Sequence, residues 1–277
     1  MRFADELLAA LHRAFAGRDV PRVHALHLPP VPWTGTRDGE FGAVELDSGA
    51  LGLSYVLLDD TLATIGEAGT AVRDASALEV ARWWAAGSGA RAALGFAAVN
   101  ALTRELFDRA GFVPPAATDS IGGLDPRPGE HIGMVGFFPP LVKQVTAHGA
   151  RLTVLERRAD LAGPRAGFHI TLDPAELASC TQVLSTSTVL LNHTLDDILA
   201  ACRSARHLAL VGPGAGCLPD GLFARGVTLL GGTWIVDPGA FKQALAAGSP
   251  WGGATRKFAL TAATYPGLPK LLAARGP

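Results

Sequence analysis

The segment formed by residues 182–219 limits the possible folds more than any other part of the chain. It contains a buried strand at 183–184, a run of small hydroxyl residues, a helix that begins near 194, and a second buried strand at 208–211. Two parallel strands joined by a helix form a βαβ unit. In open α/β sheets, ligands bind beyond the carboxyl ends of such strands. We therefore expect a binding site beside the residues that follow these two strands.

Length and composition set the broad class of protein. The chain has 277 residues, of which 48% are hydrophobic and 18% charged, so we expect a globular protein with two domains or one large one. The net charge of −1 and the lack of a basic run argue against a nucleic-acid partner. No apolar run approaches the length of a membrane span, and we expect no association with a membrane.

Two features predict a cytoplasmic protein. The first residues combine acidic side chains with helical periodicity, which is not typical of a signal peptide. Cys180, Cys202 and Cys217 lie far apart without a CxxC motif, which argues against a disulfide framework or a zinc knuckle. Because no cysteine–histidine pair has the spacing of metal ligands, we also expect no tight, preformed structural metal site.

The first part of the chain predicts a small α+β domain whose strands form an antiparallel meander. Ser76 and Glu79 have the spacing of a capping box at the start of one of its helices. The composition of residues 114–129, rich in proline and glycine, is that of a linker. The elements expected before this linker are a helix at 3–16, strands at 20–28, 42–46 and 51–58, and helices at 76–86 and 92–109.

Beyond the linker, strands alternate with helices, which predicts a mainly parallel sheet covered by helices on both faces. We place the domain boundary so that residues 1–125 form the N-terminal α+β domain and residues 126–277 form the C-terminal domain. The elements expected in the second domain are strands at 132–135, 152–155, 183–184, 208–211 and 227–230, with helices at 141–147, 194–202, 220–224 and 238–247.

The first strand-to-helix turn of the second domain differs from a dinucleotide-binding turn. Gly136 is followed by Phe137, Phe138 and two prolines rather than by the small residues of a GxGxxG motif. Proline has no backbone N–H to offer a pyrophosphate, so ordinary NAD binding is disfavoured here. Glu156 ends the next strand, where such folds place a ribose-binding carboxylate. Alternatively, Glu156 is a surface residue flanked by two arginines.

The turns after the strands at 183–184 and 208–211 supply candidate ligand contacts. Thr186, Asn192 and His193 follow the first strand, and Thr194 with Asp197 has the spacing of a capping box. We prefer Thr186 and Asn192 to His193 as site residues, because a single histidine without a second ligand is a weak indication of a metal. Asn192 could instead only shape the turn.

Other polar or small residues also allow two interpretations. Gly212 and Gly214, which flank Pro213, permit close approach of a ligand, although a tight strand-to-helix turn explains them almost as well. Cys217 is either a soft metal ligand or a packing residue. Asn100 lies inside an apolar helical segment and needs a hydrogen-bond partner if it is buried, from the protein or from a ligand.

Several longer motifs resemble a family of bacterial and archaeal proteins that carries the description "putative heavy-metal chelation" and is classed as a domain of unknown function. They are GFAAVNAL (95–102), IGMVGFFPPLV (132–142), LTVLER (152–157), STSTVLLNHTLDDIL (185–199) and GPGAGCLPDGLFARGVTLLGG (212–232). The resemblance covers almost the whole chain. It implies an enolase N-terminal-like domain joined to a Rossmann-like domain.

The resemblance also implies a binding site between the two domains. The matching positions here are Asn100, Gly136, Phe137, Thr186, Thr188, Asn192, Gly212 and Pro213. Many relatives have Ser-Thr after the Gly-Pro pair, where this chain has Gly214 and Ala215, so roles that depend on those hydroxyls do not transfer. Together with Glu156, His193 and Gly214, these residues make up the predicted ligand-binding set.

We therefore expect a protein that binds a small polar or metal-chelating ligand in the interdomain crevice, with a role in transition-metal homeostasis. A transition metal or a metal chelate is the expected cofactor class. The alternative is an enzyme that acts on a nucleotide-like or small-metabolite substrate in the same crevice, although no nucleophile elbow, Walker loop or HExxH motif is present. Assembly into a homo-oligomer is left open.

Overall fold

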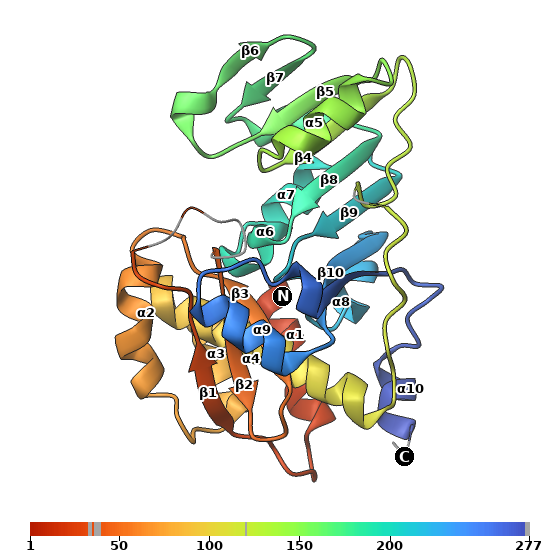
Figure 1. Ribbon diagram of the computed structural model, residues 1–277. Helices are drawn as coiled ribbons and strands as arrows, with labels where there is room; N and C mark the ends of the chain where they lie inside the picture. Colours follow the sequence, from red (N-terminus) through yellow and green to blue (C-terminus); the bar gives the residue numbers. More distant parts are fainter. Residues whose placement is uncertain (33–34, 36–39, 120, 275–277) are drawn as a thin grey trace.

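The computed structural model describes residues 1–32, 35, 40–119 and 121–274, and these residues form two separate sheets (Figure 1). The smaller sheet is the antiparallel meander that the sequence predicts, in the order β1-β2-β3. Its strands are β1 (Val23–His27), β2 (Phe41–Leu46) and β3 (Leu51–Tyr55). The larger sheet has eight strands and is mostly parallel, so the fold is α/β, as expected.

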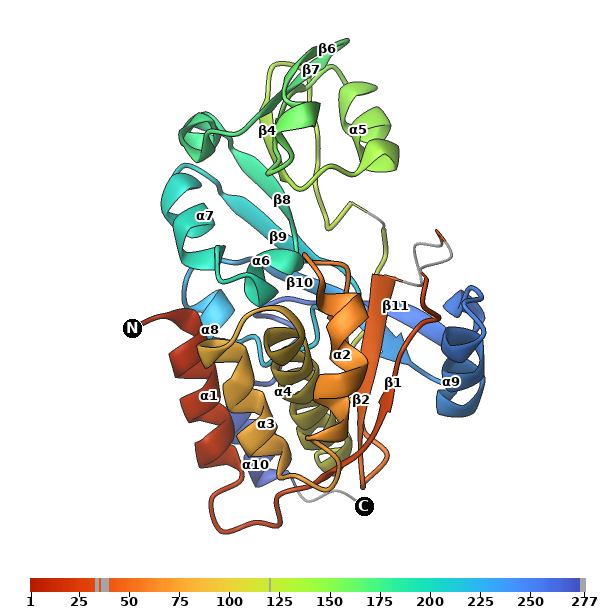
Figure 2. The ribbon, with the colours of Figure 1, turned by 90° about the vertical axis from the view of Figure 1, so that its left-hand side faces the viewer.

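The meander lies between helices of the N-terminal unit and α9 (Pro238–Ala246), which belongs to the C-terminal part of the chain (Figure 2). The N-terminal helices are α1 (Phe3–Ala14), α2 (Thr61–Thr70), α3 (Ala77–Ala86) and α4 (Gly89–Arg109). The central helix α4 is alanine-rich and almost completely buried, and it packs against β3 and α3. A Cβ added at Gly52 of β3 would come within 2.1 Å of the Ala101 nitrogen of α4, so glycine allows this close approach.

The large sheet has the strand order of a doubly wound fold. Taken along the sheet, the order is β11-β10-β9-β8-β4-β5-β7-β6, with antiparallel pairing only at the two edges. The six parallel strands therefore lie in the order that dinucleotide-binding sheets also adopt, with the reversal between β4 and β8. The strands are β4 (His131–Val135), β5 (Arg151–Leu155), β6 (Gly163–Arg165), β7 (Phe168–Thr171), β8 (Gln182–Thr186), β9 (His207–Val211), β10 (Leu229–Ile235) and β11 (Thr255–Leu260).

The two faces of the large sheet are covered by different elements. Alternate residues of β8 and β9 belong to separate core clusters, as expected for strands buried on both sides. One cluster includes α5 and Leu124 of the linker, and the other includes α7 and the N-terminal unit. The helices are α5 (Pro139–Thr146), α6 (Thr188–Leu191), α7 (Leu195–Ala201), α8 (Asp220–Phe223) and α10 (Leu268–Ala273), with short 3₁₀ turns at Ala159–Leu161, Pro174–Ser179 and Gly252–Ala254.

The linker joins the two units along one side of the molecule (Figure 1). It pairs with the outer edge of β11, where the Ala117 N–H donates to the Lys257 carbonyl (3.1 Å). His207 Nε2 lies 2.8 Å from the Gly122 carbonyl, which holds the linker on the sheet. Residue 120 of the linker lies outside the described residues. Among the described residues, no helix combines the length and the apolar character needed to cross a bilayer.

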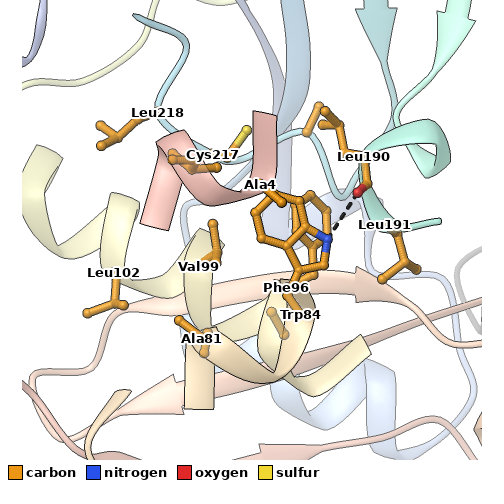
Figure 3. Packing of buried hydrophobic residues seen from close by; sticks show 14 of the residues in the cluster. Ala4, Ala81, Trp84, Phe96, Val99, Leu102, Leu190, Leu191, Cys217 and Leu218 are labelled. Atoms are coloured by element: carbon orange, nitrogen blue, oxygen red, sulfur yellow. Dashed lines mark hydrogen bonds between the residues drawn. The ribbon is translucent and has the colours of Figure 1, made fainter. Parts of the chain in front are cut away.

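A shared core joins the two units (Figure 3). Trp84 of α3 is completely buried, and its Nε1–H donates to the Leu190 carbonyl of α6 (3.0 Å). Its ring lies 5.0 Å from that of Phe96 in α4, and Cys217 and Leu218 extend the same cluster. The boundary between 1–125 and 126–277 remains a prediction, as does the likeness of the first unit to an enolase N-terminal domain.

Both predicted capping boxes are wrong. Ser76 precedes α3 without a side-chain capping bond, and the Glu79 N–H donates to the Ser76 carbonyl instead (3.0 Å). Thr194 precedes α7 in the same way, because its hydroxyl donates to Asn192 Oδ1 (2.7 Å). For Thr194 the reason is visible: its backbone (φ −93°, ψ 1°) is not extended as a capping residue's is, and its hydroxyl is bonded to Asn192. Ser76 has an extended backbone (φ −59°, ψ 128°), but its side chain makes no capping bond.

Among the described residues, six α-helices and strands were not predicted from the sequence: α2, α6, β6, β7, β11 and α10. The strand expected at 227–230 is β10, which continues to Ile235 through Gly231 and Gly232. These glycines interrupt the apolar pattern, yet the packing requires one of them. A Cβ at Gly232 would lie 2.5 Å from the Ala215 carbonyl oxygen and 2.6 Å from the Phe258 ring.

Candidate functional site

A cavity of about 640 Å³ lies between the large sheet and the N-terminal unit. It adjoins the carboxyl ends of β8 and β9, the start of α5 and strand β11, and the linker borders it. This is the region beside the strand reversal, where open α/β sheets bind their ligands. Its walls are formed by Glu40, Phe41, Tyr55, residues 117–119, Gly122, Gly123, Phe138, Pro140, Leu141, Gln144, residues 186–188, residues 211–213, Leu229, residues 231–233, Trp251, Gly252 and residues 255–259.

The turn after β8 brings two threonine hydroxyls to the cavity. Thr186 Oγ1 accepts the Thr188 N–H (3.2 Å) and donates to Thr188 Oγ1 (3.0 Å). The Thr188 hydroxyl accepts this bond and keeps its own hydrogen for another acceptor. Since Thr188 is half-buried in the cavity wall, that acceptor can be a ligand oxygen.

The turn after β9 depends on Gly212. Its φ is +149°, and an added Cβ would lie 2.4 Å from Ser187 Oγ. The Ser187 N–H donates to the Val211 carbonyl (2.8 Å), so the two turns are held directly against each other. A side chain at residue 212 would separate them and change the floor of the cavity.

Aromatic rings from both units form another wall. Phe41 of β2 packs edge-on against Tyr55 of β3 and against Trp251, with ring centroids 5.5 Å and 6.5 Å apart. Burial raises the pKa of the Tyr55 hydroxyl, and the negative charges of Glu40 and Glu156 raise it further. The phenol therefore stays protonated at neutral pH, and it can donate a hydrogen bond to a ligand.

Strand β11 places two cationic residues at the border of the cavity, Arg256 and Lys257. Successive side chains of a strand point to opposite faces, and the Arg256 guanidinium lies beside Pro114 and over Trp234, which do not line the cavity. Arg256 Nη2 donates to the Pro114 carbonyl of the linker (2.6 Å), whereas Nη1 is buried without a hydrogen-bond partner among the described residues. Burial lowers the pKa of Arg256, and the nearby positive charge of Arg104 lowers it further. Lys257 is exposed.

Four of the predicted site residues meet in the cavity wall: Thr186, Thr188, Gly212 and Pro213. Asn100, Gly136, Phe137, Glu156, Asn192, His193 and Gly214 do not line it. The sequence did not indicate the aromatic residues Phe41, Tyr55 and Trp251 or the cations Arg256 and Lys257. They come from distant parts of the chain, and β11 itself was not predicted, so no local pattern joined them.

Asn100 makes contacts with the backbone, which is one of the two interpretations that the sequence leaves open. It is 3% exposed, and its Nδ2 donates to the carbonyls of Leu53 (2.7 Å) and Gly214 (2.9 Å). The side chain thereby joins α4, β3 and the loop after β9. Its Oδ1 has no partner among the described residues.

Glu156 folds back onto the turn after β4. Its carboxylate accepts the N–H of Phe137 (3.1 Å) and that of Arg157 (2.7 Å). A backbone donor of the first strand-to-helix turn is therefore bonded to the protein's own carboxylate. This contact adds to the two prolines as an obstacle to pyrophosphate binding in that turn.

Asn192 and His193 take part in the turn between α6 and α7. Asn192 Oδ1 accepts the Thr194 N–H (3.2 Å) as well as the Thr194 hydroxyl (2.7 Å). His193 has a φ of +59°, lies with Nε2 2.8 Å from the Trp84 carbonyl and stacks on the Trp84 ring. Both side chains thus serve contacts within the protein.

Comparison with protein families identifies two matching models with one description. Both are described as "Putative heavy-metal chelation"; one matches residues 120–264 and the other residues 40–103. The chain belongs to this chelation family. No curated protein matches it.

Two crystal structures of family members have the same fold. A DUF364-family protein of unknown function from Desulfitobacterium hafniense is 19% identical, with a TM-score of 0.69 over 94% of this chain and 99% of that one. Another from Pyrococcus horikoshii is 20% identical, with a TM-score of 0.68 over 92% and 99% of the two chains. At this level of identity, the likeness extends to the fold alone.

The described side chains do not form a site that could coordinate a metal ion directly. Among the described residues, no group of three or more His, Cys, Asp or Glu side chains could hold one. All three cysteines are buried, and burial raises their pKa, to about 11 for Cys180 and about 12 for Cys202 and Cys217. They are therefore thiols at neutral pH, whereas metals bind the thiolate.

Proposed function

We propose that the chelation-family protein binds a small polar ligand, with metal chelates as the leading class, in the cavity between its two units. The observation that carries this proposal is the cavity itself. It has the volume of a small-molecule site, it lies beside the strand reversal, and hydroxyl, aromatic and cationic groups converge on it.

A metal chelate as the ligand agrees both with the family description, which mentions heavy metals, and with a cavity that has no cluster of metal donors among the described residues. Since the described residues offer no cluster of metal donors, a bound metal would bring its own ligands. The protein would then contact the outer atoms of the complex through Thr188, Tyr55 and Lys257. A role in transition-metal homeostasis follows from such binding if the chelate is the form in which the metal is carried.

An enzyme acting on a nucleotide-like or small-metabolite substrate is the second candidate. The strand order favours it, because sheets with this order bind nucleotides beside the same reversal. The obstacles in the turn after β4 count against a pyrophosphate in the usual place. Turnover of a compound that binds would distinguish an enzyme from a binding protein.

The test is a thermal-shift screen of metal salts, metal–citrate chelates and nucleotides. A ligand at a hundredfold excess over its Kd should stabilise the fold by about 2.7 kcal/mol. Gly252 lines the cavity and Gly253 does not, and a Cβ at either position meets no atom within 4 Å. We expect Gly252→Trp to reduce the shift by filling the cavity and Gly253→Trp to leave it unchanged. The proposal fails if no compound shifts the wild type or if both variants respond like it.

A further inference from the structure

We propose that the cavity binds a flat, uncharged aromatic ring whose oxygen substituent accepts a hydrogen bond from the hydroxyl of Ser187 or Thr188. The ring would lie against Phe41 and Tyr55, which line the same cavity. This inference rests on the proposed function, because it names the chemical class of the ligand. Aromatic compounds with two adjacent oxygens, such as catechol, belong to this class and are themselves chelators of metal ions.

The first observation is that the apolar face of the meander is covered at one end only. Ala43 and Leu53 lie opposite each other on β2 and β3, and they are buried, 0% and 4% exposed, in the cluster that includes Trp251. Phe41 and Tyr55 are the next pair on the same face. They are only half-buried, and they line the cavity. Two aromatic rings therefore stand where this face opens on the cavity.

A third ring, Phe138, borders the cavity from the C-terminal unit. A Cβ added at Gly136 would lie 3.1 Å from Thr186 Cγ2 and 3.6 Å from Phe138 Cε2, so the Phe138 ring lies beside Thr186. Phe138 is half-buried and lines the cavity together with Leu141 of α5. A flat ring bound in the cavity would thus meet aromatic rings from both units. Such contacts between rings contribute beyond the burial of apolar area.

The second observation is a buried hydroxyl without a partner. Ser187 is 5% exposed and lines the cavity, and its Oγ has no hydrogen-bond partner in the part of the chain that the structure describes. Buried polar groups are normally hydrogen-bonded, so a ligand acceptor would satisfy this one. Ser187 Oγ and the Leu53 carbonyl each lie 3.8 Å from the point where a Cβ of Gly214 would stand. The hydroxyl is therefore close to β3, the strand that ends in Tyr55.

The charges at the aromatic end of the cavity favour an uncharged ring. The negative charges of Glu40 and Glu156 both act on Tyr55. An anion placed beside the two rings would be repelled by these carboxylates, whereas an uncharged ring would not. A chelator that carries its oxygens on the ring also fits, because the bound metal compensates the charge of those oxygens.

Two matched amides separate the aromatic ring from its substituent. Benzamide and cyclohexanecarboxamide carry the same uncharged amide on six-membered rings, but only the ring of benzamide is aromatic and flat. We expect benzamide to bind the wild type more tightly, by about two- to tenfold, which is the range that aromatic contacts add beyond burial. Ligand-detected NMR titration measures both Kd values. Their ratio is the readout, because a general loss of stability affects both amides alike.

Three variants assign the effect to the proposed contacts. Tyr55→Leu should abolish the preference for benzamide, and Tyr55→Phe, which keeps the ring, should retain it. Ser187→Ala should weaken both amides by about two- to tenfold and leave their ratio unchanged, because it removes a hydrogen bond that both amide oxygens accept. The control Phe112→Leu removes a half-buried ring outside the cavity and should change neither Kd. Circular dichroism checks that each variant is folded.

Several results would overturn the proposal: neither amide binds the wild type, the two bind equally, or folded Tyr55→Leu keeps the preference. Unchanged binding of both amides by Ser187→Ala would overturn it as well. In each of these cases, a compound from the screen whose thermal shift is reduced by Gly252→Trp would leave the proposed function standing. If no compound behaves in this way, the proposed function fails too.

Discussion

Asn192 lies in the turn that joins α6 to α7. Asn192 was preferred as a ligand contact because an amide beside a strand tip suits a mixed polar ligand. Its Oδ1, however, accepts two hydrogen bonds from Thr194, and the side chain does not line the cavity. These contacts indicate that Asn192 shapes the turn between α6 and α7.

Asn192→Ala therefore tests the turn role against the ligand role. We expect the free energy of unfolding to fall by about 1 kcal/mol, because the Thr194 N–H and hydroxyl lose their acceptor. Affinity for the ligand found in the screen should stay unchanged. Asn192→Asp is the matched control, since a carboxylate oxygen can accept the same two bonds. A stable Asn192→Ala protein with tenfold weaker binding would restore the ligand role.

Among elements, α4 depends most on close packing between backbones. A Cβ at Gly95 would lie 2.1 Å from the Trp84 nitrogen of α3, and no flexible side chain is there to move aside. Gly95→Ala should therefore force the two helices apart. We expect a loss of about 3 kcal/mol, at the upper end of overpacking costs, measured by urea unfolding.

Gly66 provides the control for this prediction. It lies inside α2, and a Cβ there would meet no atom within 4 Å. Gly66→Ala should raise the free energy of unfolding by about 0.5–1 kcal/mol, because alanine loses less conformational freedom than glycine in a helix. If Gly95→Ala were equally harmless, the close contact between α3 and α4 would be wrong.

The same elements explain how much of the fold could be predicted. Strands with continuous apolar residues, such as β4, β5 and β9, and helices with a clear apolar face, such as α1, were found from their periodicity. The predicted end of β10 came too early because Gly231 and Gly232 interrupt the apolar pattern. Strand β11 mixes Arg256 and Lys257 with apolar residues at a sheet edge. Edge strands bury less and carry a weaker pattern, so this border of the cavity went unpredicted.

At the scale of the whole molecule, the C-terminal part covers one face of the N-terminal meander. Helix α9 packs on the face of the small sheet opposite α4 (Figure 2). Trp84 of the N-terminal unit donates a hydrogen bond to Leu190 of the C-terminal unit (Figure 3). The cavity takes lining residues from both units and from the linker, so it exists only when they are assembled. Sequence reasoning placed a site between the units but could not supply this arrangement, because its contacts join residues far apart in the chain.

A buried ion pair joins α9 to the meander. Glu45 of β2 is 9% exposed, accepts a bond from Lys242 Nζ of α9 (2.8 Å), and lies 2.6 Å from His27 Nε2 of β1. Burial by itself would raise the pKa of Glu45, but its bonds to Lys242 and His27 outweigh burial, and the pKa lies below the ordinary value of 4.5. The folded protein therefore favours the ionised carboxylate.

This pair predicts a stability that depends on pH. Since the pKa of Glu45 is lower in the folded state, its contribution is complete above the ordinary value of 4.5 and is lost as the pH falls through the folded pKa. Lys242→Met should lower the free energy of unfolding at pH 7 by about 1–3 kcal/mol, less than for a fully buried pair because Lys242 is partly exposed. The difference between the variant and the wild type should shrink as the pH falls below 4.5 and through the lowered folded pKa of Glu45, because the carboxylate that Lys242 binds is then being protonated. Urea unfolding at pH 7, 5, 4 and 3 measures that difference directly. The control for the loss of one positive charge is Lys270→Met, because this lysine of α10 has no ion pair among the described residues. A difference that stays constant over this range would show that Lys242 acts through packing and not through the charge of Glu45.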